Sequence, residues 1–247
     1  MKLIGKNTIK LDIVDSTNNY ANRQLSEKQP VEGTVVLAGF QESGRGQINN
    51  YWESEANKNL TFSIVLYPSF LEIMSQFMIS KVITLGLTDF LKQHVAEVAI
   101  KWPNDIYVGN KKIAGILVEN AIRGGEIASS IVGVGLNINQ EVFVSDAPNP
   151  ISLKLLTGVD YELDSTLQSI CDCTDYWYSK LKSGFNEELN QAFHERLYRL
   201  GEKAEFKDQQ GTFTGVIKGV NAIGQLIIED EENISKEYHF KEVEYVL

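Results

Sequence analysis

Two apolar segments constrain the fold of this chain most strongly, and one of them has glycines along one face. Residues 113–118, IAGILV, are apolar at every position, as is typical of a strand covered on both sides of a sheet. Residues 127–138 alternate between large apolar residues and a face with Gly133, Gly135 and Asn137. Interior glycines mark close approach by a ligand or by another segment, and the sequence leaves both alternatives open.

Charged and polar residues surround the turn that precedes residues 113–118. Residues 102–105, WPND, end an expected strand at 98–101, and Lys101 and Lys112 flank them. Turn chemistry accounts for Pro, Asn and Asp, and a strand-end lysine can extend its ammonium to water. A partly buried ammonium requires an anion, however, so this density of charge favours a ligand-binding turn.

A glycine-rich loop spans residues 42–54, between expected strands at 34–40 and 60–67. Gly44 and Gly46 allow the backbone to approach a phosphate, and Arg45 supplies a planar cation. The loop lacks the GK[ST] ending of a P-loop and is not a GxGxxG turn. Its length indicates function or disorder, and we expect it to become ordered when ligand binds.

Residues 15–18, DSTN, precede an expected helix that runs to about Glu27. Ser, Thr, Asn and Asp are preferred N-caps, which explains the cluster locally. A helix N-terminus also offers free N–H groups to a polar ligand. We expect the segment to serve both purposes.

Six motifs in a fixed order together resemble the biotin protein ligase family. They are DSTN at 15–18, Q-x-x-GRG at 41–46, W-x-S at 52–54, KWPND at 101–105, KIAGILVE at 112–119 and GVGLNIN at 133–139. The resemblance implies an α+β fold over residues 1–200, with a mixed sheet flanked by helices as in class II synthetase-like and biotin–lipoate ligase catalytic domains. It also implies a small SH3-like β-barrel over residues 201–247.

The resemblance implies a reaction in two steps. Biotin and ATP, with Mg²⁺, give biotinyl-5′-AMP, and a lysine of a biotin carboxyl carrier protein domain in a biotin-dependent carboxylase then takes the biotinyl group. This is the activity of a biotin–[biotin carboxyl-carrier protein] ligase. The metal ligands are not implied by any matched motif.

Matching positions assign roles to individual residues. Arg45 and Lys112 would meet carboxylate and phosphate oxygens, and Asp105 would orient or deprotonate the incoming lysine; these three form the catalytic set. The expected biotin contacts are Ser16, Thr17, Asn18, Gln41, Gly44, Arg45, Gly46, Lys112 and Gly115. The expected ATP and adenylate contacts are Arg45, Gln47, Trp52, Asn104, Lys112 and Asn137.

The chain departs from the family pattern directly after GRG. Many relatives continue with further basic residues, whereas this chain has Gln47-Ile48-Asn49-Asn50. We therefore expect the adenylate to be held less firmly here. Two alternatives to a biotin ligase are a lipoate–protein ligase and a noncatalytic biotin-binding module, and this departure is the observation that favours the module.

Charge and length limit the partners. The 247 residues carry a net charge of −10, which disfavours nonspecific binding to nucleic acid. Only 14 residues precede the DSTN motif, so we expect the single-function form without an N-terminal DNA-binding domain. With no run of about 18 apolar residues, we expect a cytoplasmic protein that does not bind membranes. A homodimer is one open oligomeric state.

The remaining periodicity predicts helices and strands without chemical roles. Helices are expected at 71–93, 163–181 and 187–200, and strands at 204–207, 211–220, 224–229 and 237–245. Cys171 and Cys173 point to different faces of a helix, so neither a disulfide nor a zinc site is expected. The three histidines are scattered along the chain and are not expected to be catalytic.

Overall fold

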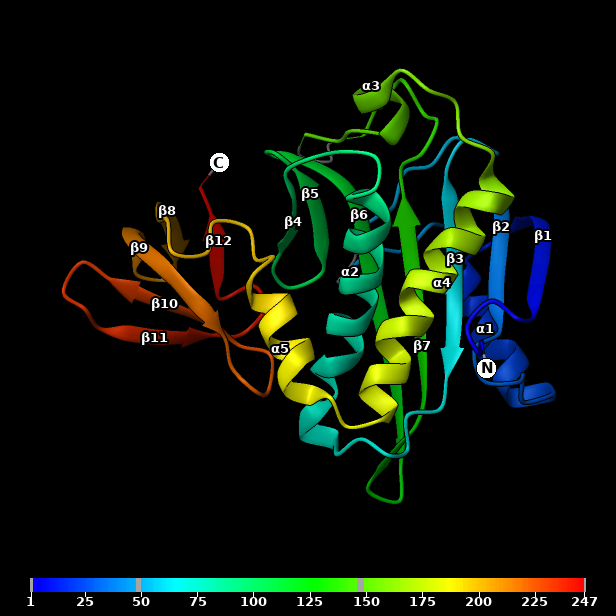
Figure 1. Cartoon of the computed structure of the whole chain (residues 1–247), viewed down its shortest axis with the longest axis horizontal. Helices are drawn as coiled ribbons and strands as arrows, with labels where there is room; N and C mark the ends of the chain where they lie inside the picture. The colour runs from blue at the N-terminus through cyan, green and yellow to red at the C-terminus, as the bar shows by residue number, and fades with distance from the viewer. Residues whose placement is uncertain (1, 48–49, 146–148, 247) are drawn as a thin grey trace.

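A seven-stranded mixed sheet forms the centre of the computed structural model, which describes residues 2–47, 50–145 and 149–246 (Figure 1). The strand order is β1-β2-β3-β7-β6-β5-β4. Among the described strands, β1 pairs with β2 in parallel, and every other neighbouring pair in this sheet is antiparallel. The strands are β1 (Thr8–Val14), β2 (Val35–Gln41), β3 (Leu60–Leu66), β4 (Val98–Lys101), β5 (Asp105–Val108), β6 (Lys111–Arg123) and β7 (Glu126–Leu136).

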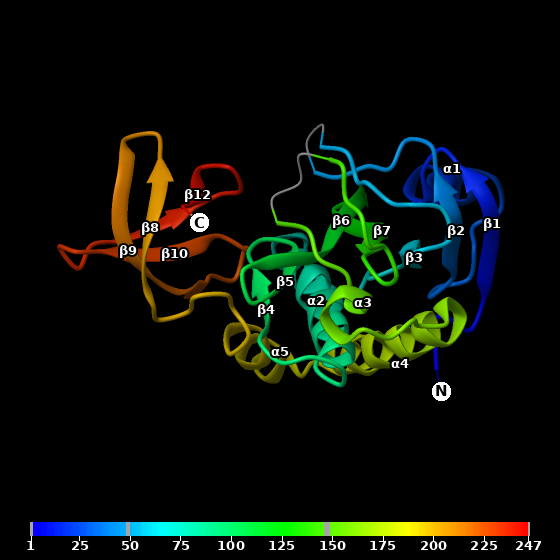
Figure 2. The same ribbon diagram turned by 90° about the horizontal axis from the view of Figure 1, so that it is seen from above.

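Helices cover both faces of this sheet (Figure 2). On one face, α2 (Phe77–Leu91) and α4 (Leu163–Lys182) pack over the main core. On the other face, α1 (Thr17–Glu27) packs through Ala21 on a smaller apolar cluster. Two short elements, η1 (Ile73–Ser75) and α3 (Leu153–Thr157), precede α2 and α4, and α5 (Asn186–His194) follows α4. The sequence prediction of a mixed sheet flanked by helices is confirmed.

The alternation in β7 separates the core from the functional surface. Val132, Val134 and Leu136 are buried in the main core. Gly133 and Gly135 lie on the opposite face with Gly115 of β6, and we call this surface the glycine face. It is the face on which α1 packs, so the helix after the DSTN motif begins beside the three glycines.

The chain ends in a second, five-stranded antiparallel sheet of order β11-β10-β9-β8-β12. Its strands are β8 (Lys203–Asp208), β9 (Gly211–Val220), β10 (Leu226–Asp230), β11 (Ser235–Tyr238) and β12 (Val243–Tyr245). Its position and size fit the predicted SH3-like domain. Among the described residues, no strand pairing joins β11 to β12 to close a barrel.

Several predicted boundaries are wrong, for local reasons. The helix predicted from residue 71 begins at Phe77, because a 3-10 turn precedes it. The helix predicted to reach residue 200 ends at His194, because the next residues pair with β4: Ile100 N donates to Arg196 O, and Tyr198 N donates to Ile100 O. The strand predicted at 237–245 is divided into β11 and β12 by a turn.

No helix in the described part of the chain is both long and apolar enough to cross a bilayer.

Candidate active site

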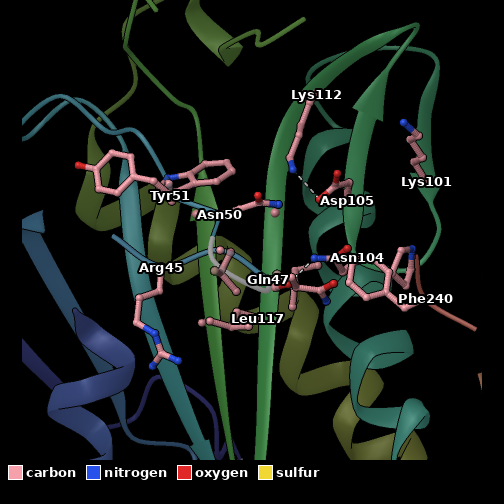
Figure 3. Close-up of a pocket in the computed structure, with 18 of the residues that line it drawn as sticks. Arg45, Gln47, Asn50, Tyr51, Lys101, Asn104, Asp105, Lys112, Leu117 and Phe240 are labelled. Atoms are coloured by element: carbon pink, nitrogen blue, oxygen red, sulfur yellow. Dashed lines mark hydrogen bonds and ion pairs between the residues drawn. The ribbon is translucent and has the colours of Figure 1, made fainter. Parts of the chain in front are cut away.

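A cavity of about 620 Å³ opens on the glycine face (Figure 3). Its walls come from the start of α1, the 42–54 loop, the KWPND turn and the end of the C-terminal sheet. The sequence-predicted residues that line it are Ser16, Thr17, Asn18, Gln41, Arg45, Gly46, Gln47, Trp52, Asn104, Asp105, Lys112 and Gly115. Motifs more than 100 residues apart in the sequence are thus brought to one surface.

Two predicted contacts, Gly44 and Asn137, do not line the cavity. Gly44 has a structural role in the loop: Trp52 N donates to its carbonyl, and a β-carbon at position 44 would lie 2.5 Å from the carbonyl oxygen of Trp52. Asn137 follows the last residue of β7, is buried, and donates from Nδ2 to Ile151 O at 3.1 Å. Its Oδ1 is buried without a hydrogen-bond partner.

The DSTN side chains are directed to a polar network rather than to helix capping. Ser16 occupies the N-cap position of α1, but its side chain makes no capping hydrogen bond. Gln41 Oε1 accepts from both Thr17 N, at 2.8 Å, and Thr17 Oγ1, at 3.1 Å. Local capping therefore does not explain this cluster in the folded chain.

Ser63 and Glu119 extend this network, and neither was predicted. Ser63 Oγ lies 2.7 Å from Thr17 Oγ1 and 2.6 Å from Asn18 Oδ1. Asn18 Nδ2 donates to Glu119 Oε2 at 2.7 Å. The sequence signal for Glu119 was its place at the end of the KIAGILVE motif, whereas nothing in the sequence distinguished Ser63.

The predicted catalytic lysine is paired with the predicted catalytic carboxylate. Lys112 Nζ lies 2.8 Å from Asp105 Oδ1, and both side chains are about four-fifths buried. The pair forms because β5 and β6 place Asp105 opposite Gly115, where no side chain separates it from Lys112. The Lys112 ammonium also lies 5.8 Å from the centre of the Trp52 ring, within cation–π range.

Arg45, the second predicted cation, is paired outside the centre of the cavity. Its Nη2 lies 2.8 Å from Glu119 Oε1, and its Nη1 donates to Asn19 Oδ1 at 2.9 Å. Figure 3 shows the guanidinium directed away from the Lys112–Asp105 pair. Each predicted catalytic cation therefore has a carboxylate of its own.

Side chains occupy the space that the glycines leave. A β-carbon on Gly133 would meet Asn18 Oδ1 at 2.5 Å, and one on Gly135 would overlap the Trp52 indole. Trp52 Nε1 is buried with no hydrogen-bond partner. Of the alternatives left open by the sequence, close packing by other segments of the chain accounts for these glycines, because Asn18 of α1 lies against Gly133 and Trp52 of the loop lies against Gly135.

The C-terminal sheet completes the cavity with residues that the sequence did not identify: Phe240, Lys241, Val243, Glu244 and Tyr245. Lys101 faces it, with Nζ 4.8 Å from the ring centre of Tyr107 and 4.9 Å from that of Tyr245. Burial lowers the pKa of Lys101. Trp102 Nε1 donates to Gly224 O at 2.8 Å and so ties the KWPND turn to this sheet.

Metal-binding residues are not clustered. Among the described residues, no three His, Cys, Asp or Glu side chains lie close enough together to hold a metal ion. Both cysteines are free, and Cys171 is buried. Mg²⁺ is usually held by one or two carboxylates together with substrate phosphates. Asp105 and Glu244 are the cavity carboxylates in the described chain that fit this arrangement.

The fold and this site define a protein of the biotin/lipoate A/B protein ligase family. The model of that family matches residues 11–137, just over half of the chain, which shows that the chain belongs to it. The matched region includes the DSTN, GRG, KWPND and KIAGILVE motifs.

Known proteins are similar to the chain well beyond this region. The bifunctional ligase/repressor BirA of Bacillus subtilis is 28% identical over 96% of this chain and 74% of its own length. The biotin–[acetyl-CoA-carboxylase] ligase of Paracoccus denitrificans is 29% identical over 87% of this chain and 90% of its own. The biotin protein ligase of Aquifex aeolicus, solved with biotin and ATP, has a TM-score of 0.81 and 28% identity, with 98% of this chain and all of that chain covered.

Proposed function

We propose that the chain is an ATP-dependent biotin protein ligase, which activates biotin as biotinyl-5′-AMP and transfers it to a protein lysine. The observation that carries this function is one cavity containing two cations, Arg45 and Lys112, beside the polar network that begins at DSTN. The relatives named above include biotin ligases, and one was solved with both biotin and ATP. They do not favour the lipoate alternative.

The site chemistry fits the first step. A carboxylate oxygen of biotin attacks the α-phosphorus of ATP, the bond to the bridging oxygen breaks, and pyrophosphate leaves. Both reactants are anions, so cations in a partly dry site reduce their repulsion. Lys112 is proposed for this role because it lines the same cavity as the residues proposed to bind biotin and the adenylate. Mg²⁺, when bound with ATP, supplies further charge neutralisation.

The second step uses the same pair. The neutral amine of the target lysine attacks the acyl carbon of the mixed anhydride, the carbon–oxygen bond to phosphate breaks, and AMP leaves. Asp105, one of the two carboxylates that line the cavity in the described chain, accepts the proton from the attacking amine. Its pairing with Lys112 fixes the position of the carboxylate, since that ion pair is largely buried.

The binding roles follow from the network. Ser16, Thr17, Asn18 and Gln41 offer hydrogen bonds to the biotin ureido group, with Gly46 and Gly115 giving backbone access. Gln47, Trp52 and Asn104 are proposed to contact the adenylate. Asn137 lies outside the cavity lining and donates to Ile151 O, so no direct contact with the adenylate is proposed for it.

Domain organisation and partners are part of this proposal. We divide the chain into a catalytic domain, 1–200, and an SH3-like domain, 201–247. The target lysine belongs to a biotin carboxyl carrier protein domain of a biotin-dependent carboxylase, and the reaction takes place in the cytoplasm. The net charge of −10 disfavours nucleic acid as a partner. Monomer and homodimer both fit, because the side chains of this site come from one chain.

The test is transfer of labelled biotin to a carrier domain with ATP and Mg²⁺, with lipoate as the competing substrate. We expect Lys112→Ala to lower transfer by about 10²-fold or more, since a preorganised charge at the reacting centre is lost. Lys111→Ala, at the exposed neighbouring position, is the matched control and should keep wild-type activity. Transfer of lipoate alone would favour the lipoate ligase, and biotin binding without adenylate formation would favour the noncatalytic module.

A further inference from the structure

Glu119 joins two parts of the site: Arg45 of the 42–54 loop, proposed to meet the carboxylate of biotin, and Asn18 of α1, proposed to meet its ureido group. Glu119 Oε1 accepts from Arg45 Nη2 at 2.8 Å, and Glu119 Oε2 accepts from Asn18 Nδ2 at 2.7 Å. Arg45 Nη1 also lies 3.3 Å from Oε2. One carboxylate therefore holds both the loop cation and a polar side chain at the start of α1.

Neighbouring residues reinforce this arrangement. Arg45 Nη1 donates to Asn19 Oδ1, and Asn19 Nδ2 donates to Asp15 Oδ2 at 2.9 Å. The guanidinium is thus bonded on two sides to the wall formed by β6 and α1. Both Arg45 and Glu119 are partly exposed, with side chains 41% and 31% accessible, so water and ligand can reach the pair.

The pair conflicts with anion binding by Arg45. A guanidinium that is already neutralised by a carboxylate at 2.8 Å attracts a second anion weakly, since the ligand must displace the first. Figure 3 shows the Arg45 side chain directed away from Lys112, which marks the reacting end of the cavity. Arginine carries several rotatable bonds, so rotation of the side chain can carry the guanidinium from Glu119 toward the cavity.

We propose that Glu119 is a positioning residue that holds Arg45 in the ligand-free enzyme and exchanges it for the ligand's anion. Biotin binding then costs the rupture of this ion pair, while the second oxygen of Glu119 continues to hold Asn18. The inference rests on the proposed function, because it takes the carboxylate of biotin as the anion that Arg45 meets.

The test is the dissociation constant of biotin for the full chain and for Glu119→Gln. Glutamine keeps the shape and an acceptor for Asn18 Nδ2 but removes the charge that opposes ligand binding. Partly exposed ion pairs contribute up to about 1 kcal/mol, so we expect the Kd for biotin to fall by about fivefold. Because the released guanidinium stabilises the ground state and the transition state equally, KM should fall while kcat stays nearly unchanged.

Three further variants distinguish release of Arg45 from a general effect of substitution on the structure. Glu119→Asp keeps the negative charge and should stay closer to the wild-type Kd than Glu119→Gln does. Glu126→Gln removes the same charge from an exposed position on the same hairpin and should leave the Kd unchanged. In an Arg45→Ala background, Glu119→Gln should no longer tighten binding, since there is no guanidinium to release.

An unchanged or higher Kd for Glu119→Gln would overturn the proposal, as would equal tightening in the Arg45→Ala background. A wild-type chain that binds neither biotin nor ATP would refute the proposed function itself, and the exchange with it. Binding to the wild-type chain is measured before any variant, so failure of the proposed function is distinguished from failure of the exchange.

Discussion

The indole of Trp52 lies so close to Gly135 of β7 that a β-carbon at position 135 would overlap the ring. Gly115 of β6 faces the same ring, with Cζ3 at 3.0 Å from the place of an added β-carbon. The absence of side chains at the two glycines thus leaves the space in which Trp52 of the 42–54 loop packs against the sheet. Because the Lys112 ammonium lies 5.8 Å from the ring, seating the loop also places an aromatic face beside the proposed catalytic cation.

Gly135→Ala should therefore displace Trp52. We expect the free energy of unfolding to fall by about 1–3 kcal/mol, the usual cost of overpacking, and biotinyl-AMP formation to decrease because the loop is no longer seated. Urea denaturation and pyrophosphate release measure the two effects. In a Trp52→Ala background the added methyl group has room, so the loss of unfolding free energy should largely disappear. A loss that persists there would contradict the packing of Trp52 against Gly135.

Lys81 gives the fold a pH dependence outside the active site. The side chain is 2% exposed, and its Nζ donates to Asn190 Oδ1 of α5 at 2.7 Å. It also lies within 5.6 Å of the ring centres of Phe77 and Phe193. Burial lowers the pKa of Lys81 from 10.5 to about 8. Between these values, the unfolded chain binds a proton that the folded chain does not.

Stability contributed by this site should therefore rise with pH from about 8 to 10.5 and be lowest below about 8. Lys81→Met removes the titration, so its stability relative to wild type should be greatest near pH 7 and decline toward pH 10.5, by about 3 kcal/mol at most. Denaturant midpoints across this range measure the difference. Lys111→Met, at an exposed lysine, should show a flat difference; a flat profile for Lys81→Met would refute the prediction.

The uncharged sequence after GRG predicts weak retention of the adenylate. Gln47 lines the cavity with its Oε1 buried and without a partner, whereas Ile48 and Asn49 lie outside the described residues. Gln47→Arg would add a cation near the developing phosphate charge, so we expect biotinyl-AMP to dissociate several-fold more slowly. Gln210→Arg, in an exposed turn of the C-terminal sheet, adds the same charge elsewhere as the control. Equal dissociation rates for Gln47→Arg and wild type would disprove the idea.

The motifs predicted most of the site because each is a short segment whose local geometry fixes its residues. Asp105 and Lys112 lie on adjacent strands separated by a tight turn, so their proximity was accessible from sequence. Asn137 shows the limit of this reasoning. Alternation placed it on the glycine face, but β7 ends at Leu136, and beyond the strand the side chain turns toward Ile151.

Contacts between distant segments could not be predicted. Glu119 meets Arg45 across 74 residues, and their pairing depends on how the loop returns over β6. Tyr245 and Phe240 enter the cavity because the C-terminal sheet packs on the KWPND turn, and no pattern within either segment specifies that packing. Periodicity identified strands and helices in this chain, whereas the docking of one sheet on another depends on the shapes of both surfaces.

That docking gives Trp102 a testable role. Trp102 Nε1 donates to Gly224 O at 2.8 Å and joins the turn that carries Asn104 and Asp105 to the C-terminal sheet. Trp102→Phe should leave a carbonyl without its donor, with a loss of about 1–2 kcal/mol in the free energy of unfolding. It should also raise the KM for biotin or ATP, because the turn and the sheet share the walls of the cavity.

Trp177→Phe is the matched control, since Trp177 is equally buried and loses a hydrogen bond from Nε1 to Asp89 Oδ2 within the helical layer. We expect this control to lose stability without a change in KM, because Trp177 does not line the cavity. Chemical denaturation and steady-state pyrophosphate release measure both quantities for each variant. If the two variants show the same KM, the C-terminal sheet does not shape the substrate site through Trp102.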